Sequence, residues 1–222
     1  AEYLNEMLFL NSDINKTQII YKQTKVEPIA IIGLSCRFPT NCNTPDLFWE
    51  FLCNKKNGMV EIPSSRMDWK SCYDVDNMGA PGKMYTNQGA LIENIEYFDN
   101  EKFNISTKEA ITMDPHQRFA LEAGYECLNE NSNKTKSIGC YVGIMTGNEF
   151  GEVVNGHKDH MGSYSTTGQG QAIVANRISY HLDLNGPSVT IDTACSSSLV
   201  AVESACQSLF FLNCDEAIVI GV

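Results

Sequence analysis

Residues 188–199 of the chain, SVTIDTACSSSL, place a cysteine between a predicted strand and a predicted helix. The apolar, β-branched run from Ser188 to Asp192 is typical of a buried strand. After Cys195, apolar side chains recur at helical spacing, and the helix is predicted to end near Asn213. The apolar positions are Leu199, Val202, Cys206 and Leu209. The order strand, sharp turn, helix predicts that Cys195 lies at or just before a helix N-terminus.

This position has chemical consequences for Cys195. The unpaired N–H groups and the macrodipole of a helix N-terminus favour a thiolate. The same N–H groups can donate to an oxyanion that forms when a thiolate attacks a thioester carbonyl. The alanine and three serines around the cysteine leave room for an acyl chain. The alternative is a small buried cysteine at a tight turn, and the residues alone leave both interpretations open. Cys206 and Cys214 lack the strand–turn–helix context and are interpreted as structural.

Three further runs share the pattern of a strand buried on both faces. Residues 28–34 (PIAIIGL), 138–144 (IGCYVGI) and 216–222 (EAIVIGV) are continuous or nearly continuous apolar segments with a glycine near their ends. Strands of this kind belong to parallel sheets with helices on both faces. By contrast, residues 69–89 are rich in Gly, Asp, Asn and Pro, which predicts a long surface excursion.

Helix signals lie between these runs. Residues 45–51 are predicted to be helical with Thr44 as the cap, and Ser106 with Glu109 fits a capping box. Asp114 is a predicted N-cap followed by proline, and one buried helix face is predicted beyond it. The members of that face are Phe119, Ala120, Ala123, Cys127 and Leu128. Strands that alternate with helices predict a layered α/β/α domain with a mostly parallel sheet.

Composition excludes several classes of protein. The 222 residues carry a net charge of −11, and the 16 basic residues are scattered, so nucleic-acid binding is not expected. No stretch is long enough for a membrane span. The nine cysteines form no C-x-x-C pair, and no signal peptide precedes them, which favours reduced thiols and a cytoplasmic location. His157-x-x-His160 is a weak metal signal, and Gly168-Gln169-Gly170 is a weak phosphate-loop signal.

The chain resembles the β-ketoacyl synthase domains of type I polyketide and fatty-acid synthases. Residues 192–199 (DTACSSSL) are similar to the active-site signature of that family, and the likeness runs in order from about Pro28 to Val222. His116 departs from the pattern, because the family usually has glutamine there. The other matching stretches are 28–33 (PIAIIG), 36–39 (CRFP), 48–49 (FW), 113–118 (MDPHQR), 175–180 (ANRISY) and 184–188 (LNGPS).

The resemblance implies a fold and a reaction. The fold is thiolase-like, with two similar halves related by pseudo-symmetry, and the complete domain usually pairs as a homodimer. Residues 27–222 would form the N-terminal half, after a linker or tail over 1–26. Cys195 would accept an acyl group from the phosphopantetheine arm of an acyl carrier domain. A malonyl-type extender would then lose CO₂ and attack the acyl-cysteine. No cofactor is expected to bind directly.

The family also uses two histidines that lie in its second half. The four histidines of this chain match neither motif, and the chain stops at a strongly apolar strand, so we expect a truncated domain that cannot condense by itself. These histidines are His116, His157, His160 and His181. One alternative is an inactive remnant of such an enzyme. Another is a cysteine hydrolase, but the local signatures of papain-like and caspase-like proteases are absent.

Overall fold

The computed structural model describes residues 28–128, 136–145, 150 and 162–222, so the predicted linker over 1–26 lies outside the described residues. Contacts divide the chain into two units, Ala1–Ala30 and Ile31–Val222. The helices and strands of the described residues belong to the second unit. In chain order they are α2 (Pro45–Cys53), β1 (Val60–Glu61), the 3₁₀ helix η1 (Trp69–Ser71), β2 (Gln88–Gly89), α3 (Thr107–Thr112), α4 (Pro115–Cys127), β3 (Ile138–Gly143), α6 (Ser165–Gln169), α7 (Ile173–His181), β4 (Ser188–Ile191), α8 (Ser197–Phe210) and β5 (Glu216–Gly221).

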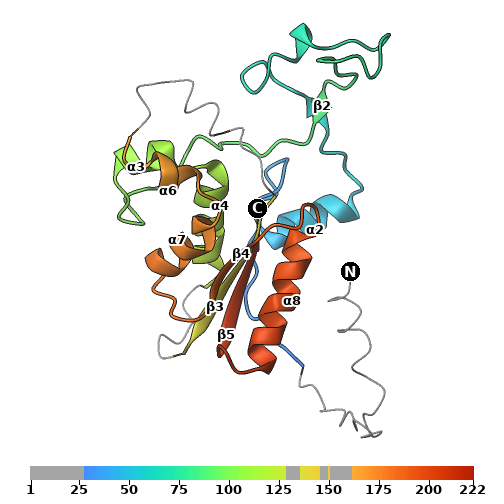
Figure 1. The fold of residues 1–222 in the computed structure, drawn as a ribbon. Helices are drawn as coiled ribbons and strands as arrows, with labels where there is room; N and C mark the ends of the chain where they lie inside the picture. Colours follow the sequence, from blue (N-terminus) through green and yellow to red (C-terminus); the bar gives the residue numbers. More distant parts are fainter. Residues whose placement is uncertain (1–27, 129–135, 146–149, 151–161) are drawn as a thin grey trace, which may run out of the picture. The chain divides into compact units, whose positions relative to one another are not determined.

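Three strands form a parallel sheet in the order β4-β3-β5 (Figure 1). In this register Gly143, the last residue of β3, lies opposite both Ile191 of β4 and Gly221 of β5. Each strand begins and ends within one residue of a run predicted from the sequence, so these three predicted strands are confirmed. The helices α7 and α8 provide the crossover connections that parallel strands need.

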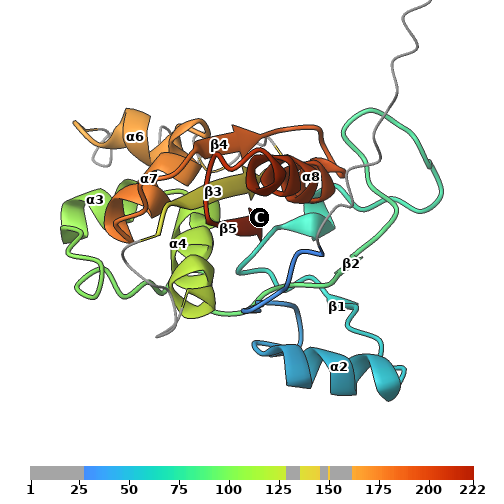
Figure 2. The same cartoon turned by 90° about the horizontal axis from the view of Figure 1, so that it is seen from below.

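Helices cover both faces of this sheet, which confirms the predicted layered α/β architecture. Cys140 and Val142 of β3 pack on the side of α4 and α7, whereas Tyr141 packs on the side of α8. Successive side chains of a strand point to opposite faces, so one strand serves both layers. Figure 2 shows α8 on one side of the strands and α4 with α7 on the other.

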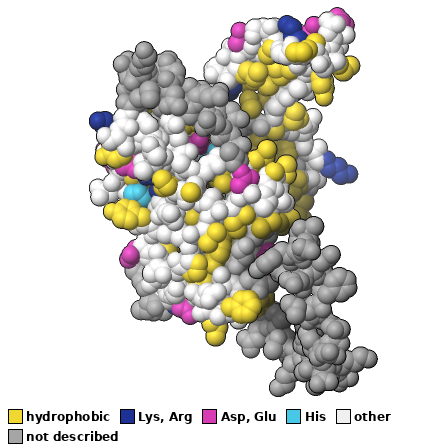
Figure 3. All heavy atoms as spheres, viewed as in Figure 1, with side chains coloured by type: hydrophobic (Ala, Val, Ile, Leu, Met, Phe, Trp, Pro, Cys, Tyr) yellow, Lys and Arg dark blue, Asp and Glu magenta, His cyan; other side chains and the backbone are white. Residues whose placement is uncertain are grey.

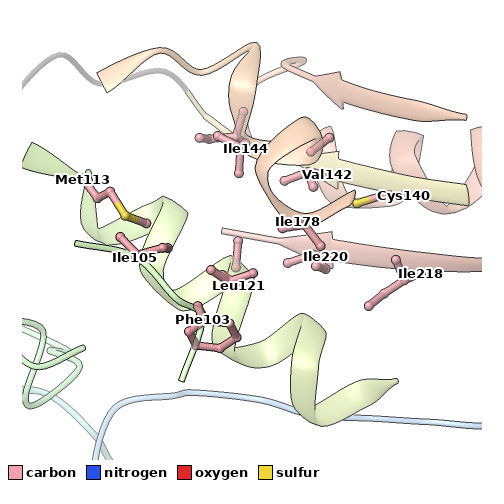
Figure 4. Close-up of a cluster of buried hydrophobic side chains, with 13 residues drawn as sticks. Phe103, Ile105, Met113, Leu121, Cys140, Val142, Ile144, Ile178, Ile218 and Ile220 are labelled. Carbon is pink, nitrogen blue, oxygen red and sulfur yellow. The ribbon is translucent and has the colours of Figure 1, made fainter. Parts of the chain in front are cut away.

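The face toward α4 and α7 holds the main hydrophobic core (Figure 4). Leu121 of α4 and Ile178 of α7 are fully buried there against Val142, Ile218 and Ile220 of the sheet. Large branched side chains fill this layer. The loop residues Phe103 and Ile105 and the residue Met113, at the end of α3, close its far side.

On the opposite face, the buried residues that α8 contributes are small. Ala201 and Ala205 of α8 are buried against Tyr141. Of the four apolar positions that predict this helix, Leu199 is 74% exposed and Val202 is also exposed, whereas Cys206 and Leu209 are half-buried. Figure 3 shows hydrophobic side chains, in yellow, over the region of α8 on the viewed face. The helix is confirmed, but Ala201 and Ala205, rather than Leu199 and Val202, are buried against the sheet.

The predicted helix starts are confirmed with one difference. The Thr44 hydroxyl accepts from the N–H of Leu47, and the Asp114 carboxylate accepts from the N–H of His116. Ser106 accepts from the N–H of Glu109 as a capping box requires. The Glu109 carboxylate does not return to Ser106, because it accepts a 2.5 Å bond from Arg177.

The buried face of α4 is centred differently from the prediction. Gln117, Ala120, Leu121 and Gly124 are its buried residues, and of the five predicted positions only Ala120 is buried. Gly124 lies on this face because the helix approaches Ile178 and Ile220, and a Cβ at Gly124 would be 3.2 Å from the Ile220 side chain. A buried glutamine and glycine are invisible to a search for hydrophobic periodicity.

Gln117 belongs to a buried polar network around Arg177. The Arg177 guanidinium donates to the Gln117 side chain at 2.7 Å and to Glu109, while its side chain is 6% exposed. The Gln117 amide donates to the carbonyl groups of Thr167 and Gly170. The network therefore joins α3, α4, α6 and α7, and all of its charged groups are partnered.

The predicted strand over 28–34 is wrong. Ile31, Ile32 and Leu34 are between 70% and 79% exposed, and the segment has no strand partner among the described residues. Residues 33–35 lie against α4 instead, where Ser35 donates to the carbonyl of Ala123 and a Cβ at Gly33 would be 2.5 Å from the carbonyl oxygen of Cys127. An apolar run becomes a strand only when another strand satisfies its N–H and C=O groups.

The predicted surface excursion over 69–89 is confirmed as mostly irregular. It contains η1 and β2, and β2 pairs antiparallel with β1. Trp69 anchors its start, since the indole is buried and donates to the carbonyl of Ile62 at 2.7 Å. Asp74 then accepts hydrogen bonds from Asp76 and Asn77, which closes an exposed turn.

Candidate active site

Cys195 lies in the turn 192–196 that joins β4 to α8. The residue before it, Ala194, has φ +56°, which places a side-chain-bearing residue in the left-handed region. Such a conformation costs about 1–3 kcal/mol and persists only where surrounding contacts impose it. The structure thus confirms the predicted strand–turn–helix order, with Cys195 two residues before the first residue of α8.

Side-chain hydrogen bonds hold this turn. The Asp192 carboxylate accepts from the N–H of Ala194 at 2.9 Å. The Ser197 hydroxyl donates to the carbonyl of Ala194 at 2.7 Å and accepts from the N–H of Thr193 at 2.8 Å. Ala194 is therefore fixed through both of its peptide groups, which explains how the left-handed conformation is kept.

Ser197 has a role that the sequence analysis missed. The serines after Cys195 were predicted to leave room for an acyl chain, yet Ser197 is only 3% exposed and closes the turn. The available signal was a serine two residues beyond a cysteine at a helix start, where hydroxyl groups commonly bond to nearby backbone. Ser196 is exposed and also bonds within the turn, to the carbonyl of Thr193.

The Cys195 thiol is free and exposed, so the alternative of a small buried cysteine is wrong. All nine cysteines are free, and only Cys53 shares this exposure. Burial raises the pKa of Cys127 and Cys214, and it raises the pKa of Cys140 to about 12. These buried thiols are therefore poor nucleophiles at neutral pH, because the thiolate is the reactive form.

Two of the four histidines are described, and neither belongs to the turn that carries Cys195. His116 stands in the first turn of α4, with its Nδ1 atom 2.9 Å from the Asp114 carboxylate. His181 ends α7, and burial, followed by the positive charge of Arg177, lowers its pKa. His157 and His160 lie outside the described residues, and so does the weak metal signal that they form.

The described residues contain no cluster of His, Cys, Asp and Glu that could hold a metal ion. Gly168 and Gly170 do not form a phosphate loop. Gly168 is buried in α6 against the carbonyl of Thr112, and its own carbonyl accepts from the N–H of Asp114. Within the described residues, no helix is both long and apolar enough to cross a membrane.

The chain matches known proteins over most of its length. Residues 26–222 match the family model described as β-ketoacyl synthase, N-terminal domain. A phenolphthiocerol/phthiocerol polyketide synthase of Mycobacterium tuberculosis is 40% identical over 200 residues, which cover 88% of this chain and 13% of that protein. A highly reducing polyketide synthase of Aspergillus aculeatus is 42% identical over 188 residues, which cover 82% of this chain and 8% of that protein.

Solved structures give the same result. The oxazolomycin ketosynthase domain of Streptomyces albus has a TM-score of 0.77 and 30% identity, over 86% of this chain and 33% of that one. The ketosynthase from module 6 of the bacillaene synthase of Bacillus subtilis has a TM-score of 0.72 and 35% identity, over 87% and 31%. The chain thus spans about a third of these ketosynthases, and their likeness confirms the predicted thiolase-like α/β fold. The chain belongs to the β-ketoacyl synthase family, whose N-terminal domain it matches.

Proposed function

We propose that this chain is the acyl-accepting part of a polyketide synthase ketosynthase and that Cys195 is its nucleophile. The observation that carries the proposal is an exposed, free cysteine in a strained turn directly before α8. The signature around Cys195 and the polyketide synthases among the relatives support it. Cys53 is equally free and exposed, but it ends a helix rather than preceding one.

The first step is acyl transfer from a carrier. The Cys195 thiolate attacks the carbonyl carbon of an acyl thioester on the phosphopantetheine arm of an acyl carrier domain. A bond forms between Sγ and the carbonyl carbon, the bond to the carrier sulfur breaks, and the carrier leaves as a thiolate that takes up a proton. First-turn N–H groups of a helix have no intrahelical partner. In α8 the N–H of Ser197 donates to the carbonyl of Ala194, so the N–H groups of Ser198 and Leu199 are the ones suited to stabilise the negative oxygen of the intermediate.

The second step is decarboxylative condensation. A malonyl-type extender on the carrier loses CO₂, its carbanion attacks the acyl-cysteine, and Cys195 leaves as a thiolate. This step requires groups that stabilise the developing negative charge. We propose that residues outside this chain supply them, because the two described histidines, His116 and His181, do not belong to the turn of Cys195. The 222 residues alone then accept an acyl group and do not condense.

The remaining partners follow from this assignment. An acyl carrier domain delivers the thioesters, no cofactor binds directly, and the complete ketosynthase forms a homodimer. Residues 27–222 form the N-terminal half of the domain and residues 1–26 a linker or tail. The nine free thiols favour a location in the reducing cytoplasm.

The test is acyl labelling of the purified chain. The chain is incubated with an acyl-N-acetylcysteamine thioester, and the added mass is located by peptide mass spectrometry. We expect labelling of the wild type and of Cys53→Ala, which removes the other exposed thiol, and none of Cys195→Ala. Equal labelling of Cys195→Ala would refute the proposal.

Condensation is tested in the same samples. A malonyl-loaded carrier is added to the acylated chain, and products are separated by chromatography. No carbon–carbon bond formation is expected from the 222 residues. The inactive-remnant alternative is tested on the complete native polypeptide, for which our proposal predicts a condensed product and the alternative predicts none.

A further inference from the structure

Two glycines lie side by side beneath the start of α8. Gly143 and Gly221 are paired in the register of β3 and β5, at the carboxyl ends of both strands. Neither has a positive φ, so the backbone conformation does not require glycine at either position. The requirement is space, because the first turn of α8 passes directly over them.

The contact at Gly143 is between two backbones. A Cβ at this position would be 2.5 Å from the carbonyl carbon of Ser197 and from the nitrogen of Ser198. Ordinary contacts of a Cβ begin near 3.4 Å, so any side chain at Gly143 has to lift the helix start by about 1 Å. Backbone atoms in a hydrogen-bonded helix cannot rotate away as a side chain can.

The contact at Gly221 is of a different kind. A Cβ there would be 2.5 Å from the Oγ atom of Ser198 and 3.0 Å from its Cβ. Here a side chain, not the backbone, fills the space, so a substitution at Ser198 can relieve part of the clash. Both glycines therefore allow the first turn of α8 to approach the sheet. We expect substitutions at the two positions to have different consequences.

Ser197 connects Gly143 and Gly221 to the turn that carries Cys195. Its backbone rests on Gly143, and its hydroxyl accepts from the N–H of Thr193 and donates to the carbonyl of Ala194 within the turn. A displacement of Ser197 therefore also displaces the turn 192–196, because the Ser197 hydroxyl is bonded to it. Further along α8, the side chains of Ala201 and Ala205 are buried against the sheet.

We propose that Gly143, with Gly221 beside it, is a positioning residue for Cys195. The pair lets α8 begin close enough to the sheet for the N–H groups of Ser198 and Leu199 and the Cys195 thiol to act on one carbonyl. This inference rests on the proposed acyl transfer. A displacement of about 1 Å in a reacting group costs on the order of 100-fold in rate, which sets the expected effect.

The central comparison is Gly143→Ala against Gly186→Ala. Gly186 precedes β4, at the other end of the sheet, and a Cβ there would be 2.6 Å from backbone atoms of Ile138. The two substitutions thus create backbone clashes of the same severity, and only one lies beneath Cys195. Gly89→Ala is the mild control, because its Cβ would find nothing closer than 3.5 Å.

Three quantities are measured on the 222-residue chain. They are the midpoint of thermal unfolding, the rate of acyl transfer to Cys195, and the rate of alkylation of Cys195 by iodoacetamide relative to Cys53. We expect Gly143→Ala and Gly186→Ala to lower the midpoint similarly. Only Gly143→Ala should slow acyl transfer, roughly 100-fold per folded molecule. Similar slowing by Gly186→Ala, or unchanged transfer in Gly143→Ala, would overturn the proposal.

A double substitution keeps the test decisive if Gly143→Ala does not fold. Gly221→Ala should slow acyl transfer, and adding Ser198→Ala should restore part of the rate because it removes the clashing Oγ atom. If the rate of acyl transfer is not restored, the proposed close contact between Gly221 and Ser198 is contradicted, since double-mutant cycles detect coupling between residues in contact.

Failure of the proposed function gives a different result. If wild-type Cys195 takes no acyl group, the assignment of Cys195 falls while the alkylation ratio still reports on its position. Gly143→Ala should then change the ratio of Cys195 to Cys53 alkylation several-fold, and Gly186→Ala should leave it unchanged. An unchanged ratio in both variants would refute the positioning role itself.

Discussion

The two faces of the parallel sheet are packed in opposite ways. Toward α4 and α7, large side chains such as Leu121 and Ile178 fill a broad core. Toward α8, Ala201, Ala205 and glycine let a helix approach the strands closely. Burying large aliphatic groups contributes about 1.5–3 kcal/mol each, whereas alanine contributes far less. The first face therefore supplies most of the stability, and the second sets the position of Cys195.

Thiol labelling should separate the two faces most strongly. Burial on the α4–α7 face raises the pKa of Cys140 to about 12, so its thiol stays protonated and unreactive at pH 8. We expect iodoacetamide to label Cys195 and Cys53 in the native chain, with Cys140 labelled only in denaturant. Peptide mass spectrometry over time measures this, and native labelling of Cys140 at the rate of Cys53 would contradict the described core.

Removing a large side chain should affect stability without affecting chemistry. Leu121 is fully buried on the α4–α7 face, and Leu121→Ala should lower the free energy of unfolding by about 3 kcal/mol. Urea denaturation measures the loss, and Leu121→Met is the volume-conserving control. Acyl transfer per folded molecule should stay at the wild-type rate. A large loss of that rate would mean that this face also positions Cys195.

Adding a large side chain to the other face should have the converse result. Ala201→Leu places extra volume between α8 and Tyr141, which should cost about 1–3 kcal/mol and lift the helix that follows Cys195. Acyl transfer per folded molecule should therefore fall. Val202→Leu, one residue further along and exposed, is the matched control. Equal rates in Ala201→Leu and Val202→Leu would show that the spacing between α8 and the sheet does not matter.

The smallest effect concerns Glu122 on α4. Burial raises the pKa of this carboxyl, and the nearby Arg37 offsets part of the shift. A raised pKa means that the stability contributed by this group is complete below its unfolded pKa and is lost as pH rises through its folded pKa. Glu122→Gln should then increase the unfolding midpoint slightly at pH 7 and leave it unchanged near pH 3. Thermal melts at both pH values measure this, with the exposed Glu101→Gln as control; a decrease at pH 7 would contradict it.

Much of the fold was predictable because its signals are local. Asp114 followed by proline marks the start of α4, and the run 138–144 marks the central strand whatever else the chain does. The order of strand, turn and helix around Cys195 was predictable for the same reason. Each of these signals depends on residues within one or two turns of the element.

The errors have nonlocal causes. The run 28–34 has the composition of a strand, but pairing depends on distant residues, and Gly33 and Ser35 contact α4 instead of another strand. The apolar spacing of Leu199 and Val202 located α8 but not the side that contacts the sheet. From the sequence, Gly143 is only the glycine near the end of a predicted strand. Its contact with the Ser197 backbone depends on how β3, β5 and α8 pack together, which the local sequence does not specify.

The strand order has a consequence for the newly made polypeptide. β3 is the first of the three strands to leave the ribosome, yet both of its neighbours, β4 and β5, are encoded after it. Until they emerge, the most deeply buried strand of the sheet has two open edges, and open apolar edges are sites of aggregation. The nascent chain therefore needs protection by a chaperone or by rapid pairing during the interval between the synthesis of β3 and that of β5.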